Sequence, residues 1–183
     1  MSLQHIFLEA KNKDRIAQDI LVRHFWHRMF TICERYVKNK QDVEERLQDG
    51  FVKFFRNIDN YNYDSDARLF SLLATIMYHE CIKQLNIKIR MYIVSEPVED
   101  DKTLEEEPYD FLTTEEIHKV ICSLPDGYRI VFNLYVMEGL SHDEISKLLN
   151  ISCSASRSQL TKAKKLLKKI LSAKGIKYGK DSK

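Results

Sequence analysis

The sequence predicts an all-α protein made of two small helical domains joined by an acidic linker, with a helix-turn-helix in the C-terminal domain. Apolar residues recur at helical spacing through most of the 183 residues. Five Gly and three Pro are too few for a turn-rich β architecture. Residues 95–116 hold ten acidic side chains and one Lys, a net charge of −9. These observations divide the chain into residues 1–90, 91–113, 114–172 and 173–183.

The N-terminal part is expected to contain one short and three long helices. The short helix covers residues 3–10, and the long helices cover residues 14–38, 41–56 and 68–90. Residues 57–66 are dense in Asn, Asp and Ser and are expected to form a loop. In the first long helix the expected core positions are Ile16, Ile20, Leu21, Phe25, Met29, Ile32, Cys33 and Tyr36. In the second they are Val43, Leu47, Phe51, Phe54 and Phe55.

The segment 91–113 contains two Pro, dense acidic residues and no sustained periodicity, so it is expected to be a flexible linker. A short helix is expected over residues 114–122, and another begins at Pro125 and ends at Gly139. The expected buried face of the latter consists of Tyr128, Val131, Phe132, Tyr135 and Val136. The residues after 172 are rich in Lys and Gly and are expected to form a frayed basic tail.

Residues 141–167 have the pattern of two helices joined by a tight turn. Ser141 and Glu144 form a capping-box pair at the start of the first helix, and Ser152 is the expected N-cap of the second. The second helix has a narrow inward stripe of Ser156, Leu160, Ala163 and Leu167. Its other faces carry Arg157, Ser158, Gln159, Thr161, Lys162, Lys164 and Lys165. This pattern predicts a helix-turn-helix whose second helix enters the DNA major groove.

The charge distribution bears on whether this hairpin binds DNA. A solvated amphipathic hairpin inside a helical bundle would show the same two-helix pattern. Residues 141–183, however, hold eleven basic and three acidic side chains, a net charge of +8, whereas residues 1–94 carry +3. Positive charge gathered on the segment with the helix-turn-helix favours binding to a polyanion.

Five motifs stand at fixed spacing in residues 123–167: Leu124-Pro125, Arg129, Glu138 to Ser141, Glu144-Ile145 and Ile151-Ser152. In this combination the run resembles, without a gap, the promoter-reading C-terminal domain of sigma-70 family factors. Ser156 to Leu160 is similar to the extracytoplasmic-function (ECF) type of that family. The resemblance implies recognition of the minus-thirty-five promoter element. The implied DNA contacts are Ser154, Ala155, Arg157, Ser158, Thr161, Lys162 and Lys165.

The helix expected over residues 41–56 carries Glu44-Glu45, then Gln48-Asp49, then Phe51. With residues 57–90, it resembles the N-terminal core domain of the same family, where this helix docks on the clamp of the polymerase. The residues implied to bind core RNA polymerase are Glu44, Glu45, Gln48, Asp49 and Lys53. The same charges also suit a salt-laced surface helix without a partner, and that alternative stays open at this point.

The helix over residues 68–90 departs from the family pattern, with Leu72, His79 and Asn86 in place of Trp, Asn and Arg. These departures leave the minus-ten sequence preference open. Two tyrosines stand in the loop where the family captures an unstacked base, a role that suits aromatic rings. Loop tyrosines are also common as lids over a core. The implied minus-ten contacts are Tyr61, Tyr63, Arg68, His79, Lys83, Asn86 and Arg90.

No motif for catalysis or metal binding stands out. The chain has no phosphate-binding Gly loop, HExxH or nucleophile elbow, so neither an enzyme nor a small-molecule substrate is expected. His24 and His27 lie one turn apart, but no Cys or carboxylate is spaced to complete a site, so no metal or cofactor is expected. The cysteines expected to be buried, reduced thiols are Cys33, Cys81, Cys122 and Cys153.

The sequence patterns and the resemblance together give a functional expectation. No apolar run is long enough to cross a bilayer and no signal-peptide pattern occurs, so a cytoplasmic protein is expected. The resemblance implies a transcription initiation factor that binds core RNA polymerase and promoter DNA, with melting by the N-terminal domain. It also implies an anti-sigma factor, often membrane-spanning in this family. The alternative is a helix-turn-helix regulator that does not engage polymerase and uses residues 1–90 for dimerisation or sensing.

Overall fold

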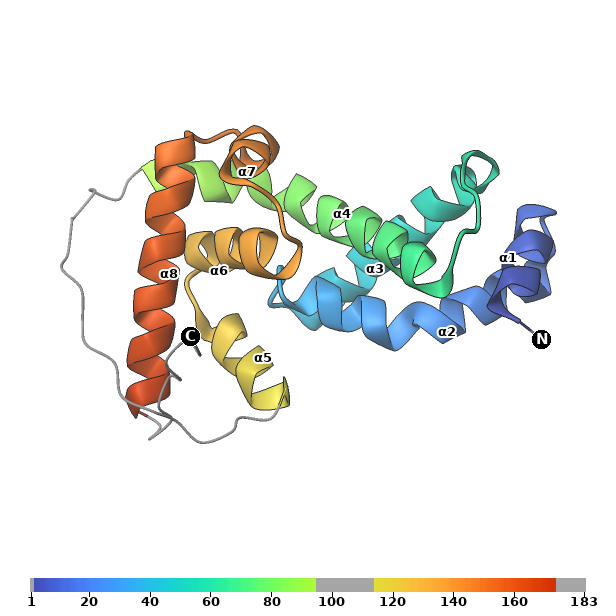
Figure 1. Ribbon diagram of the computed structural model, residues 1–183, viewed down its shortest axis with the longest axis horizontal. Coiled ribbons are helices and arrows are strands. Elements are labelled where there is room, and N and C mark those ends of the chain that lie inside the picture. The colour runs from blue at the N-terminus through green and yellow to red at the C-terminus, as the bar shows by residue number, and fades with distance from the viewer. Residues whose placement is uncertain (1, 95–113, 174–183) are drawn as a thin grey trace, which may run out of the picture. The chain divides into compact units, whose positions relative to one another are not determined.

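The computed structural model describes residues 2–94 and 114–173, and every regular element in these two ranges is helical (Figure 1). The side chains of residues 84, 86–94, 114 and 115 are not described. The chain divides into two compact units, residues 1–84 and 85–183. This arrangement confirms the all-α prediction with two helical parts.

The N-terminal unit contains four α-helices and one short 3₁₀-helix. They are α1 (Leu3–Lys11), α2 (Arg15–Glu34), α3 (Lys40–Arg56), η1 (Ile58–Asn60) and α4 (Asp66–Val94). The first three begin at side-chain caps, since Ser2, Asp14 and Asn39 accept hydrogen bonds from the backbone N–H groups of His5, Ala17 and Gln41. Helix α4 crosses the boundary between the units. Helix α4 also continues four residues beyond its predicted end at residue 90. The sequence has no helix-breaking proline before Pro97 that would stop it earlier.

The core of the N-terminal unit is built mainly on one stripe of α2. Most of the predicted core positions of this helix are buried, but the expectation for two was wrong: Ile16 is 73% exposed and Ile20 is 37% exposed. The buried stripe instead begins at Ala17, one position later. A run of apolar residues at Ile16, Ala17, Ile20 and Leu21 fits two neighbouring stripes equally well, and packing on α1 and α3 decided between them.

Helices α3 and α4 approach closely at a glycine. A Cβ atom added to Gly50 would overlap the sulfur of Met77. Gly50 is buried in the middle of α3, where glycine is otherwise unfavourable because of its backbone entropy. The missing side chain therefore serves the packing of Met77 from α4 against α3.

Within residues 114–173, the C-terminal unit has four α-helices and a π-helical turn. They are α5 (Thr114–Ser123), α6 (Asp126–Phe132), the π-helix η2 (Asn133–Met137), α7 (His142–Leu149) and α8 (Cys153–Ala173). The segment ends at Gly139, whose φ of +73° suits glycine, as the sequence predicted. Two expected core residues were placed wrongly, because Tyr135 and Val136 are 38% and 46% exposed. The buried stripe runs through Ile130, Val131 and Leu134 instead.

Arg129, a residue on which the sequence resemblance rests, is buried inside the C-terminal unit. Only 1% of it is exposed, and its guanidinium pairs with Asp126 at 3.1 Å and donates to the Cys122 carbonyl at 3.3 Å. Burial lowers the pKa of Arg129, and the neighbouring Asp126 carboxylate opposes that change. Arg129 therefore ties the start of α6 to the end of α5.

The four cysteines of the chain are not joined in disulfides. Cys33 and Cys81 are buried, as predicted, whereas Cys122 and Cys153 are only half-buried. A hydrogen bond with Cys33, together with burial, raises the pKa of the Cys81 thiol, which keeps it protonated. In the described part of the chain, no helix has the length and apolar character needed to span a membrane. The linker was predicted over residues 91–113, but its first four residues belong to α4, and residues 95–113 lie outside the described residues. The predicted tail, residues 173–183, likewise begins inside α8 with Ala173, and its remainder lies outside the described residues.

Candidate protein and nucleic-acid interfaces

Helix α3 presents the predicted docking residues on its solvent side. Its inner stripe packs into the N-terminal unit and consists of Val43, Leu47, Gly50, Phe51 and Phe54. Phe55, also expected in the core, is half-buried. The predicted docking residues fall between the stripe residues, on other faces of the helix. Of the predicted docking residues, Glu44 is half-exposed, and the exposed ones are Glu45, Gln48, Asp49 and Lys53.

Two of these carboxylates are held from below by Arg46, which the sequence analysis did not single out. The side chain of Arg46 is only 12% exposed. Its Nη1 lies 2.8 Å from Asp49 Oδ2, and its Nη2 pairs with Glu45 Oε1. Burial lowers the pKa of Arg46. The hydrogen bond to Glu45 and the charges of the Asp49 and Glu45 carboxylates raise it by more than burial lowers it, so the net change in the pKa is upward. The outer face of α3 is therefore organised by ion pairs inside the unit.

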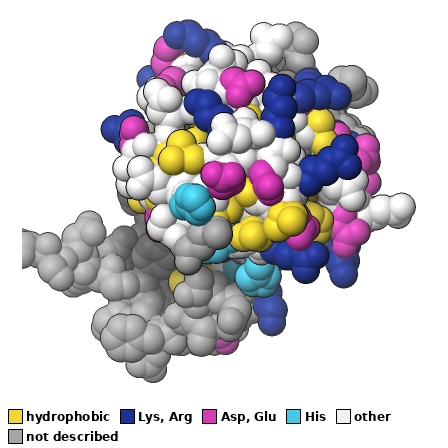
Figure 2. Space-filling model, turned by 90° about the vertical axis from the view of Figure 1, so that its right-hand side faces the viewer, with side chains coloured by type: hydrophobic (Ala, Val, Ile, Leu, Met, Phe, Trp, Pro, Cys, Tyr) yellow, Lys and Arg dark blue, Asp and Glu magenta, His cyan; other side chains and the backbone are white. Residues whose placement is uncertain are grey.

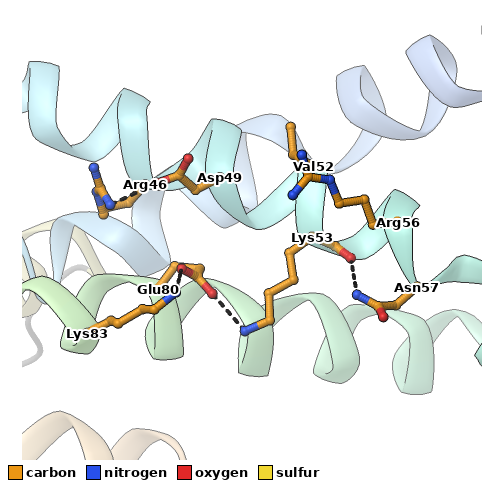
Figure 3. Close-up of a pocket in the computed structure, with 8 residues that line it drawn as sticks. All are labelled: Arg46, Asp49, Val52, Lys53, Arg56, Asn57, Glu80 and Lys83. Atoms are coloured by element: carbon orange, nitrogen blue, oxygen red, sulfur yellow. Dashed lines mark hydrogen bonds and ion pairs between the residues drawn. The ribbon is translucent and has the colours of Figure 1, made fainter.

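A groove of about 560 Å³ lies between α3 and α4 (Figure 3). Glu80 of α4, 5% exposed, accepts from Lys53 at 2.7 Å and from Lys83 at 3.5 Å. Burial raises the pKa of Glu80, but the hydrogen bonds and charges of the two lysines lower it more, so Glu80 is ionised. The residues that line the groove are Arg46, Asp49, Val52, Lys53, Arg56, Asn57, Glu80 and Lys83.

On one face of this unit, charges of both signs are interspersed rather than separated (Figure 2). Figure 2, taken from the side on which α1 lies in Figure 1, shows basic, acidic and apolar side chains next to one another. A surface of this kind favours contacts made by individual side chains over attraction by one broad field.

Both loop tyrosines pack on the core of the N-terminal unit. The ring of Tyr61 stacks on Phe54 with centroids 5.7 Å apart and planes 14° apart, and Tyr63 lies 5.8 Å from Phe7. The hydroxyl of Tyr63 donates to Asp66, which raises the pKa of Tyr63. Each ring is half-buried, so one part covers the core while another faces solvent.

The other predicted minus-ten residues follow one face of α4, since positions 68, 79, 83, 86 and 90 recur at helical spacing. Arg68, His79 and Lys83 are exposed. Burial and the charge of Lys53 lower the pKa of His79, while Glu80 opposes them, so its ring is neutral at pH 7. The side chains of Asn86 and Arg90 lie outside the described residues.

Helices α7 and α8 form the predicted helix-turn-helix. The capping box is present: Ser141 Oγ accepts from the Glu144 N–H at 3.2 Å, and Glu144 Oε2 accepts from the Ser141 N–H at 2.8 Å. The Ser141 hydroxyl and then the Ser141 N–H, which both donate to Glu144 Oε2, lower the pKa of Glu144. Asn150 makes the turn with a left-handed φ of 54°, and Ser152 caps α8 by accepting from the Ala155 N–H at 3.0 Å. Both caps were predicted.

The inner face of α8 matches the predicted stripe and is wider than expected. Ser156, Leu160, Ala163 and Leu167 are buried, which confirms the prediction. The prediction that Gln159 lies on an outer face was wrong, because the residue is only 3% exposed. Ser156 also binds His142 of α7, with 2.9 Å between Oγ and Nδ1. The wider stripe arises because α6 as well as α7 packs on this helix.

The outer face of α8 carries the predicted DNA contacts. Ser154, Arg157, Thr161 and Lys165 are exposed, whereas Ala155, Ser158 and Lys162 are half-exposed. Burial, and then the nearby charges of Arg157 and Lys164, lower the pKa of His142. A helix with this outer face matches what major-groove binding requires.

Comparison with known families assigns both units. The family model "Sigma-70 region 2" matches residues 21–87, and "Sigma-70, region 4" matches residues 114–167. The two matches occur in this order and together cover more than half of the chain. The chain belongs to the sigma-70 family. It is a transcription initiation factor of the ECF type.

Individual relatives of this sigma factor have low sequence identity to it but match most of its length. It is 25% identical to ECF RNA polymerase sigma factor SigE of Mycolicibacterium smegmatis over 84% of its own length, and it spans 61% of that protein. It is 24% identical to RNA polymerase sigma-H factor of Pseudomonas aeruginosa, covering 92% of this chain and 93% of that one. The ECF sigma-E factor of Escherichia coli K12 is 25% identical, with 84% and 86% covered.

Two solved structures are also similar to this sigma factor. A structure of CnrH with the cytosolic domain of CnrY has a TM-score of 0.49 and 18% identity, covering 93% of this chain and 97% of that one. The Bartonella quintana sigma factor RpoE, solved with the anti-sigma factor NepR, has a TM-score of 0.49 and 17% identity, with 84% and 96% covered.

Sequence reasoning missed two residues that organise the N-terminal surface of this sigma factor. Arg46 stands three positions before Asp49, so helical spacing alone could have suggested their pair. Glu80 stands three positions before Lys83, but its shorter bond to Lys53 joins two helices that are far apart in the sequence. No local pattern could have indicated that second contact.

Proposed function

We propose that this sigma factor binds core RNA polymerase through α3 and directs it to promoters by two DNA-reading domains. The observation that carries the proposal is the presence of regions 2 and 4 in one chain, in the family order. The first domain, residues 1–90, opens the minus-ten element, and the second, residues 114–172, reads the minus-thirty-five element. The acidic residues between the end of α4 at Val94 and the start of α5 at Thr114 connect them as a linker.

The docking surface comprises Glu44, Glu45, Gln48, Asp49 and Lys53. Their position on the solvent side of α3 supports this assignment. Minus-thirty-five contacts come from the outer face of α8, where Arg157 and Lys162 supply cationic donors for bases and phosphates. Minus-ten contacts come from Tyr61 and Tyr63 and from the face of α4 that carries Arg68, His79 and Lys83, with positions 86 and 90 on the same face.

The work of such a factor is binding, so it needs no catalysis or cofactor of its own. It acts where polymerase and chromosome are, which in bacteria is the cytoplasm. An anti-sigma factor, often tethered to a membrane in this family, is the proposed inhibitory partner. It would compete with core polymerase for the chain, and a competition binding assay measures that directly.

The docking assignment is tested by reversing one charge. Asp49→Lys should weaken binding to core polymerase by about tenfold or more, because a close favourable charge pair becomes repulsive. Arg157→Ala is the reciprocal control: core binding should persist while minus-thirty-five binding falls by about 1–3 kcal/mol. Unaltered polymerase affinity for Asp49→Lys, with an unaltered circular dichroism spectrum, would favour a salt-laced surface helix instead.

A further inference from the structure

The acidic residues of α3 differ in how they are held. Glu45 and Asp49 share one guanidinium, that of Arg46, which is almost entirely buried. Glu44 has a pair with Lys40 at 4.0 Å, in which the Lys40 side chain is 79% exposed. A pair of that length between exposed groups is screened by water and restrains neither side chain. Two of the three carboxylates are thus fixed in place.

The Arg46 guanidinium approaches the Glu45 and Asp49 carboxylates from the protein side. Their side chains remain 61% exposed at Glu45 and 49% exposed at Asp49, so each keeps accessible oxygen surface. An ionised carboxylate offers about four lone-pair positions, and one guanidinium nitrogen occupies only part of them. A cationic side chain of a partner can therefore bind on the outer side while Arg46 stays below.

We propose that Arg46 is a positioning residue for polymerase docking: it fixes Asp49 and Glu45 in the orientation in which lysine or arginine side chains of the polymerase meet them. This inference rests on the proposed docking through α3. Immobilising a side chain on association costs free energy, and groups already held in the free protein do not incur that cost again. Guanidinium suits the role because its planar donors reach two carboxylates at once, which an ammonium group does not reproduce.

The test replaces the guanidinium of Arg46 by an ammonium group, which keeps the positive charge but removes the planar pair of donors. Arg46→Lys should weaken core polymerase binding by about three- to tenfold, the size expected when one or two side chains become mobile. Arg23→Lys is the matched control, since it is the same exchange at an arginine of α2 that also pairs with a carboxylate, that of Asp19, and lies outside the groove and the docking surface. Polymerase affinity of that variant should be unchanged.

A double-mutant cycle separates positioning from structural support. In the background Glu45→Gln, Asp49→Asn, the change Arg46→Lys should cause no further loss of polymerase affinity, because its targets are gone. A loss of the same size in both backgrounds would overturn the inference, as would unchanged or tighter binding of Arg46→Lys alone. If Arg46→Lys unfolds, Arg46→Met, which keeps the apolar stem, is measured by the same cycle.

The outcome also distinguishes this inference from the docking proposal itself. If Asp49→Asn and Glu45→Gln do not weaken polymerase binding, the docking assignment fails. If they weaken it but Arg46→Lys does not, docking through α3 stands and the positioning role of Arg46 is overturned.

Discussion

Single residues in the N-terminal domain do work that their charge or size alone would not suggest. Lys53 was expected to face a partner, yet its ammonium is also bonded to the buried Glu80. Gly50 lies in the middle of α3, where alanine would normally stabilise the helix more than glycine does. Both cases follow from the approach of α4 to α3, which neither helix encodes separately.

Gly50→Ala should destabilise the protein despite the better helix propensity of alanine. The propensity gain is roughly 0.5–1 kcal/mol, while forcing a methyl group against Met77 costs roughly 1–3 kcal/mol. The expected net loss in the free energy of unfolding is about 1–2 kcal/mol, measured by urea denaturation. In a Met77→Ala background the same change should be neutral or stabilising. Equal losses in both backgrounds would show that the contact is not the cause.

Glu80 should make stability depend on pH in the acid range. Its folded pKa lies below the ordinary value of 4.5, so its contribution is full above that value and is lost as the pH falls through the lowered pKa. Glu80→Gln should lower stability at pH 7 by about 1 kcal/mol, a figure reduced because both lysines are partly exposed. Thermal unfolding followed from pH 7 to pH 3 should then show a smaller acid-dependent loss for the variant than for the parent.

At the scale of elements, the helix-turn-helix is fixed by its ends as much as by its faces. The capping box starts α7, the left-handed Asn150 closes it, and the Ile151 N–H bonds to the Ser146 carbonyl at 3.0 Å. These local signals place α8 in register so that Ser156 and Leu160 reach the core. Recognition by the outer face of α8 therefore depends on the geometry of a single turn.

Asn150→Ala should weaken this turn, because alanine is strained at positive φ whereas asparagine and glycine tolerate it. The expected loss in the free energy of unfolding is about 1 kcal/mol. Asn150→Gly is the matched control and should be close to neutral. Thermal denaturation of the two variants checks the order. Equal stability of the two would mean that the left-handed conformation carries no strain at this position.

At the scale of the whole molecule, charge is divided according to task. The C-terminal segment 141–183 carries +8, residues 1–94 carry +3, and the acidic stretch 95–116 carries −9. Polyanion binding thus has its strongest electrostatic support at the helix-turn-helix. The N-terminal domain has less net charge, and its DNA contacts depend more on aromatic and polar groups. This division predicts that finding and opening a promoter can be separated by mutation.

The loop tyrosines provide that separation. Because Tyr61 packs on Phe54, Tyr61→Leu is preferred to Tyr61→Ala: it keeps the core covered and removes base stacking. It should reduce permanganate-detected melting by roughly five- to a hundredfold, corresponding to a stacking loss of about 1–3 kcal/mol, while minus-thirty-five binding persists. Tyr63→Leu should act in the same direction. Tyr61→Phe, which keeps the ring, is the control.

A template already mismatched at the minus-ten region should rescue much of the defect, because its opening cost has been removed. If Tyr61→Leu loses activity equally on intact and mismatched templates, the two rings serve only to cover the core.

The sequence by itself determined the features that depend on neighbours along the chain. Helical periodicity, the Ser141–Glu144 box, the Ser152 cap and Gly139 are local signals, and the structure has each of them where it was expected. The motifs around Leu124 and Glu138 pointed to the sigma-70 family for the same reason. A motif is defined by the spacing of its residues along the chain, so it can be recognised without knowing the fold.

Only the tertiary structure decided which of several possible faces is buried and which charges meet across helices. Ile16 and Ile20 are as apolar as Leu21, yet packing selected the neighbouring stripe. Gln159 is buried because α5, α6 and α7 all pack on α8. The Lys53–Glu80 bond and the contact of Gly50 with Met77 join α3 to α4 across more than twenty residues of sequence. Such contacts depend on how helices approach in space, which no period within one helix specifies.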